Sequence, residues 1–76
     1  MSFQDSLFAE WRAADRAASA MEAANARASL DAIAGRGQPP SMAQRFKTVA
    51  LRGVADDLYK VAMKLMEERA ERNARA

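Results

Sequence analysis

The chain has 76 residues, a formal net charge of +2, and neither cysteine nor histidine. These absences exclude disulfides, a zinc site, an imidazole base and a thiolate nucleophile. Half of the residues are hydrophobic, but 19 of these 38 are alanine, so few large side chains remain to fill a core. Because ordering each residue costs about 1.5 kcal/mol, we expect one small unit that relies on regular helices or on self-association.

No segment of the sequence suggests a membrane or an export signal. The longest uncharged stretch, residues 37–44, is eight residues long and contains two prolines, far less than a membrane span needs. The N-terminal residues lack the basic start and apolar core of a signal peptide. The sequence therefore predicts a cytoplasmic protein.

The first predicted element is a long helix over about residues 2–34. No glycine or proline interrupts this segment, and it holds twelve alanines, which favour helix. Gly35 stands where a helix commonly ends in a left-handed residue. Residues spaced alternately by four and three predict a coiled-coil seam, in which a polar Asn25 either fixes the register or lies at the edge. The seam residues are Leu7, Trp11, Ala14, Ala18, Met21, Asn25, Ala28 and Ala32.

Residues 35–40 predict a turn because they contain two glycines and two prolines. Ser41, followed three residues later by Gln44, is typical of a capping box and predicts a second helix over about residues 41–73. A set of apolar residues in this helix recurs every three or four positions, so we expect them to be buried on one face. They are Met42, Phe46, Ala50, Val54, Leu58, Val61 and Leu65.

The short turn predicts an all-α fold, an antiparallel two-helix hairpin. Facing residues should have numbers that add up to about 75, which places small residues opposite large ones. The expected pairs are Trp11 with Leu65, Ala14 with Val61, Ala18 with Leu58, and Met21 with Val54. Since two helices have no third layer to close their core, we expect a homodimer that forms a four-helix bundle.

Several apolar side chains fall beside the two predicted seams, near the N-terminus and the matching part of the second helix. We predict a partner or dimer interface there, anchored by aromatic residues and methionines. Its residues are Phe3, Phe8, Tyr59, Met63 and Met66, together with Leu7 and Trp11 of the adjoining seam. Two alternatives stay open: a monomer with scattered exposed apolar residues, or a different protein that covers the cluster.

The positive charge collects around the turn, where residues 35–53 carry +4 with no acidic residue. Basic side chains at a helix start do not help the helix itself, since acids are preferred there. We consider Arg36, Arg45, Lys47 and Arg52 a candidate site for an anion or for nucleic acid. The alternative is an ordinary solvated helix start.

The sequence contains no arrangement typical of catalysis. The acidic neighbours Asp56 and Asp57 point about 100° apart on a helix and cannot share a proton. We therefore expect no enzyme and no cofactor. The leading hypothesis is a small helical protein interaction module, such as an adaptor, chaperone-like protein or regulatory subunit. The alternative is a nucleic-acid-binding hairpin dimer that uses the basic turn region on phosphates.

Overall fold

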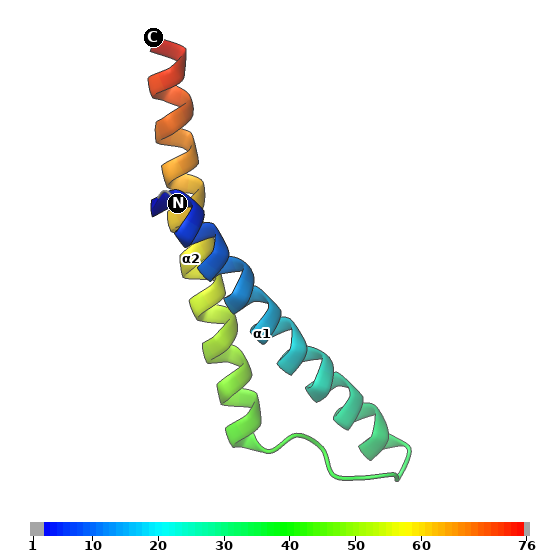
Figure 1. Ribbon diagram of the computed structural model, residues 1–76. Helices are drawn as coiled ribbons and strands as arrows, with labels where there is room; N and C mark the ends of the chain where they lie inside the picture. Colours follow the sequence, from blue (N-terminus) through cyan, green and yellow to red (C-terminus); the bar gives the residue numbers. More distant parts are fainter. Residues whose placement is uncertain (1–2, 76) are drawn as a thin grey trace.

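The computed structural model describes residues 3–75 and, among the side chains, those of residues 5–75. Two helices, α1 (Phe3–Ile33) and α2 (Met42–Arg75), make up the fold, and residues 3–75 contain no strand. The helices run antiparallel and form an elongated hairpin of 62 × 20 × 15 Å (Figure 1). The predicted all-α hairpin is thus confirmed, with helix bounds within two residues of the expected ones.

The end of α1 is fixed by a Schellman motif. Gly35 adopts the left-handed φ of +75°, which an L side chain would disfavour. The N–H of Arg36 donates to the carbonyl of Asp31 at 2.7 Å, and the N–H of Gly35 donates to the carbonyl of Ala32 at 3.1 Å. These bonds satisfy carbonyls that the end of a helix leaves without partners, so α1 stops where the sequence predicts.

The start of α2 is fixed by the predicted capping box. The N–H of Gln44 donates to Ser41 Oγ at 3.1 Å, and the N–H of Ser41 donates to Gln44 Oε1 at 2.8 Å. Both helix ends at the turn are therefore satisfied by residues close in sequence. Within the turn, Pro40 is buried.

The side of α1 that faces α2 is the predicted seam. Ala18 is fully buried and Leu7 retains 7% of its exposure. The other six seam residues, Trp11, Ala14, Met21, Asn25, Ala28 and Ala32, are half-buried. The alternation of four and three residues thus located the contact face of α1 correctly.

The contact face of α2 differs from the prediction. Ala55 and Ala62 are buried. Four half-buried residues complete this face, and the six positions are spaced alternately by three and four residues. The half-buried residues are Thr48, Leu51, Leu58 and Leu65. Of the predicted face only Leu58 and Leu65 lie here. Met42, Phe46, Val54 and Val61 are 73%, 67%, 54% and 49% exposed, and Ala50 is exposed as well. The predicted face was rotated by about one residue, or roughly 100°.

Small residues explain this rotation. α2 carries two stripes with helical spacing, one of large side chains and one that includes Ala55 and Ala62. The second stripe lets α2 approach the alanine-rich face of α1 closely, so that tightly packed atoms replace gaps. It also brings polar groups of α2 within bonding distance of partners on α1.

The register is set by contacts along the hairpin. Asn25 Nδ2 donates to Thr48 Oγ1 at 2.6 Å, and the Thr48 hydroxyl donates to the Gln44 carbonyl at 2.8 Å. Nearer the N-terminus, the Trp11 and Tyr59 rings lie 5.5 Å apart, tilted by 49°. The bond from Asn25 ties the two helices together at this register, and Trp11 packs on Tyr59.

The two ends of the hairpin are open. Figure 1 shows α1 and α2 diverging toward the turn, where Leu30 and Ile33 are 65% and 84% exposed. At the other end, α2 continues past the start of α1, and residues 66–75 are all exposed. The helices thus cover each other only along the middle of the molecule.

Candidate interaction surfaces

Arg52 links the two helices through three side chains of α1. Its Nη1 donates to Asp15 Oδ1 at 2.8 Å, and its Nη2 donates to Ser19 Oγ at 3.2 Å. Nε and Nη2 donate to the two carboxylate oxygens of Glu22 at 3.2 and 2.7 Å. The planar guanidinium fits this fork-shaped arrangement, and the spacing of Asp15, Ser19 and Glu22 by four and three residues places all three along one side of α1.

This arrangement shifts the ionisation of both partners. The hydrogen bonds from Arg52 hold the pKa of Glu22 below its ordinary value of 4.5, against a smaller opposing effect of burial. The bonds to Glu22 and then Asp15 raise the pKa of Arg52, which stays charged at any ordinary pH. Both groups are partly exposed, with 30% and 45% of their side-chain surface accessible, so solvent screens the attraction.

The four basic residues predicted as an anion site do not form one group. Arg52 serves the contact between helices. Arg36 Nη2 lies 3.2 Å from Asp31 Oδ1, an exposed pair at the end of α1. Arg45 and Lys47 are exposed on the first turns of α2, and neither has an ion pair within residues 5–75. The structure therefore leaves two of the four without a carboxylate partner.

The residues predicted as an interface are divided between the interior and the surface. Leu7 is buried, and Trp11, Phe8 and Met63 are half-buried. Tyr59 and Met66 remain 47% and 49% exposed. The Phe3 side chain lies outside the described residues. Leu7 and Trp11 thus contribute to the hairpin itself, and the exposed remainder is small.

More strongly exposed apolar side chains lie on the side of α2 that faces away from α1. Met42, Phe46 and Val49 are 73%, 67% and 71% exposed, and with Gly53 they are spaced by four, three and four residues. This spacing places the four residues on one side of the helix, turned away from Ala55 and Ala62. We call Met42, Phe46, Val49 and Gly53 the outer face of α2.

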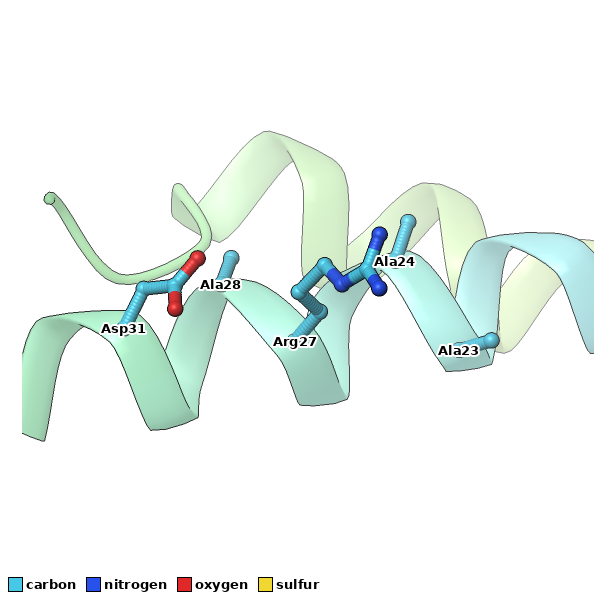
Figure 2. A pocket seen from close by; sticks show the side chains of 5 residues that line it. All are labelled: Ala23, Ala24, Arg27, Ala28 and Asp31. Atoms are coloured by element: carbon cyan, nitrogen blue, oxygen red, sulfur yellow. The ribbon is translucent and has the colours of Figure 1, made fainter. Parts of the chain in front are cut away.

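We consider two open hollows on the surface of the described residues. One, of about 670 Å³, runs along α1 and is lined by three alanines with Arg27 and Asp31 (Figure 2). In Figure 2 the Arg27 side chain extends over successive turns of α1 toward Ala24. No deeply enclosed polar group marks it as a ligand site, since no buried side-chain nitrogen or oxygen among the described residues lacks a partner.

The second hollow, of about 300 Å³, lies beside the outer face of α2. It is lined by five residues of α2 and one residue of α1. They are Glu22, Thr48, Val49, Arg52, Gly53 and Asp56. Gly53 leaves this space open, because a Cβ added there would meet no atom within 4 Å.

The described residues contain no cluster of three or more acidic side chains arranged to hold a metal ion. Neither α1 nor α2, within those residues, combines the length and apolar character that crossing a membrane requires. No family model, no curated protein and no solved structure matches the chain.

Sequence reasoning missed the outer face because it assigned Met42 and Phe46 to the contact between helices. A signal for the correct assignment was present in α1. Asp15, Ser19 and Glu22 follow the seam on one side, and the structure gives them their cation by turning Arg52 inward. That rotation carries Phe46 outward.

Proposed function

We propose that the chain is a small helical interaction module without catalytic activity, which acts by self-association through the outer face of α2. One observation carries this proposal: Phe46 is 67% exposed between Met42 and Val49, which are exposed to a similar extent. Single exposed apolar residues are ordinary on protein surfaces, but a contiguous stripe that includes an aromatic ring is typical of an interaction site.

The weak interior of the hairpin supports the same proposal. The buried hydrophobic residues are Leu7, Ala18, Ala55 and Ala62, and no large side chain in residues 5–75 is fully buried. A protein of two helices lacks a further layer that would close its core. A second copy supplies that layer and gives the four-helix arrangement predicted from sequence.

The experiment is sedimentation equilibrium of the full chain over a range of concentrations. We expect the mass to rise from that of the 8.3 kDa chain to twice this value as concentration increases. A constant monomer mass up to about 100 μM, where an association of useful strength would be evident, would contradict self-association. Phe46→Ser is expected to shift the transition to higher concentration, whereas Ile33→Ser, at an 84% exposed position on α1, should not.

Nucleic-acid binding is less well supported by the geometry. Arg36 and Arg52 already have carboxylate partners, which leaves Arg45 and Lys47 as phosphate contacts. We therefore expect a fluorescent RNA hairpin to remain unbound by the purified chain even at low salt, where phosphate contacts are strongest.

A further inference from the structure

Gly53 has no role inside the hairpin. Glycine is the poorest helix former after proline, yet it stands in the middle of α2, a helix of 34 residues. Neither close packing nor a special backbone angle requires it, because a Cβ at this position would meet no atom within 4 Å and its φ is not left-handed. Its effect is to leave this turn of the outer face without a side chain, in open space beside Val49.

Phe46 and Gly53 form a complementary pair across two copies. They lie seven residues apart on the same face, which is two helical turns or about 10 Å. Two antiparallel copies of α2 related by a twofold axis between Val49 and Ala50 bring Phe46 of each copy level with Gly53 of the other. Each exposed ring then packs over the partner's glycine, where no side chain opposes it, and the twofold axis makes both contacts at once.

The charges on α2 favour the same antiparallel arrangement. The segment from Met42 to Gly53 contains Arg45, Lys47 and Arg52 and no acid, whereas Asp56 and Asp57 follow directly. Arg45 and Asp56 lie on the same flank of the outer face. When two copies of a helix pair antiparallel about a twofold axis, each flank meets the same flank of the other copy. Neither residue has an ion pair within residues 5–75. A parallel pair would place like charges side by side.

We propose that a second copy of this chain docks antiparallel on the outer face of α2, with Phe46 over the partner's Gly53 and Arg45 beside the partner's Asp56. This rests on the proposed self-association and specifies its surface and symmetry. The inner faces of both hairpins, which hold the Arg52 contacts, stay as they are.

The first test exchanges the charges. Arg45→Asp and Asp56→Arg each place two like-charged pairs in the dimer, so each is expected to weaken dimerisation about tenfold by sedimentation. The double variant restores the opposite charges and should return the affinity to near the wild-type value. The proposed pairing would be overturned if the effects of the two single variants simply added up and the double variant showed no recovery of affinity.

The second test adds a side chain at position 53. Gly53→Leu replaces a poor helix former in open space, so the hairpin should melt at the same or a higher temperature at low concentration. The same change blocks the space for Phe46 and is expected to abolish the dimer. Phe46→Ala should weaken the dimer about 100-fold because two anchor rings are lost. Ile33→Ala, which removes an exposed apolar residue from α1, serves as the matched control.

The outcomes separate this inference from the proposed function. If the wild-type chain stays monomeric, self-association and the docking arrangement both fail. If it dimerises but Gly53→Leu and the charge exchange leave the affinity unchanged, the interaction module stands and the antiparallel α2 interface is wrong. Two results together support the interface. Gly53→Leu should lose the dimer while keeping its helicity, and the double charge variant should recover the affinity.

Discussion

The two sides of α2 use opposite kinds of residue. The side that faces α1 has buried alanines at 55 and 62 together with Thr48 and Arg52, which bond to α1. The outer face has Phe46, 67% exposed, in solvent. On α2 the contact within the chain therefore includes close approach at alanines and polar matching, and Phe46 takes no part in it. Size alone does not indicate which side of a helix is inside.

The largest effect should come from crowding the alanine contact. Ala18→Leu adds a branched side chain at a position with no exposed surface, and overpacking costs about 1–3 kcal/mol. For so small a hairpin we expect most of the helical circular dichroism signal at 25 °C to be lost. The neighbouring Ala17→Leu, on the exposed side of α1, should change stability by less than about 0.5 kcal/mol. Equal stability of the two variants would show that the helices do not approach at Ala18.

Removing the aromatic contact should have the next largest effect. A fully buried tryptophan loses about 3–5 kcal/mol on truncation, and Trp11 is half-buried against Tyr59, so Trp11→Ala should cost about 2 kcal/mol by urea unfolding. Trp11→Phe keeps a ring and should cost less than half as much. A wild-type midpoint in Trp11→Ala would mean that the ring contributes nothing to the hairpin.

The hydrogen bond between Asn25 and Thr48 should have a smaller effect. The bond is 2.6 Å long and partly buried, so a double-mutant cycle of Asn25→Ala and Thr48→Val should give a coupling energy of about 1 kcal/mol. Serine at position 29 is also half-buried on α1 but has no bond to Thr48, and a cycle of Ser29→Ala with Thr48→Val should give no coupling. Coupling near zero in both cycles would remove Asn25 as the residue that fixes the register.

The smallest effect is a dependence of stability on pH. Because the pKa of Glu22 is lowered in the folded chain, the unfolded chain takes up a proton first as the pH falls. The stabilisation from Arg52 is therefore complete above the ordinary value of 4.5 and is lost as the pH falls through the lower folded value. Melting temperatures between neutral and acidic pH should fall less steeply in Glu22→Gln than in the wild type. Glu67→Gln, on the uncovered end of α2, provides the comparison, and identical slopes for Glu22→Gln and the wild type would contradict the role of this pair.

Local features of the fold could be predicted from the sequence, and the mutual orientation of the helices only in part. The stop at Gly35 and the start at Ser41 depend on neighbouring residues, which a pattern describes fully. The α1 seam was also found, because Leu7, Trp11 and Met21 leave one consistent face. On α2 two faces had helical spacing, and the choice between them depended on Asp15, Ser19 and Glu22 of the other helix. The exposed outer face, and with it the candidate site, followed from that choice.

The order of contacts along the hairpin has a consequence for how the chain folds. The bond from Asn25 to Thr48 spans 23 residues and those from Arg52 span 30 to 37, while the Trp11 and Tyr59 rings are farther still from the turn. Each successive contact closes only a slightly longer loop than the last, and the entropy of loop closure rises slowly with length. With both helix ends at the turn capped by local bonds, pairing can begin at Asn25 and Thr48 and advance toward Trp11 and Tyr59. Such sequential pairing of neighbouring contacts is typical of helical proteins that fold within microseconds to milliseconds.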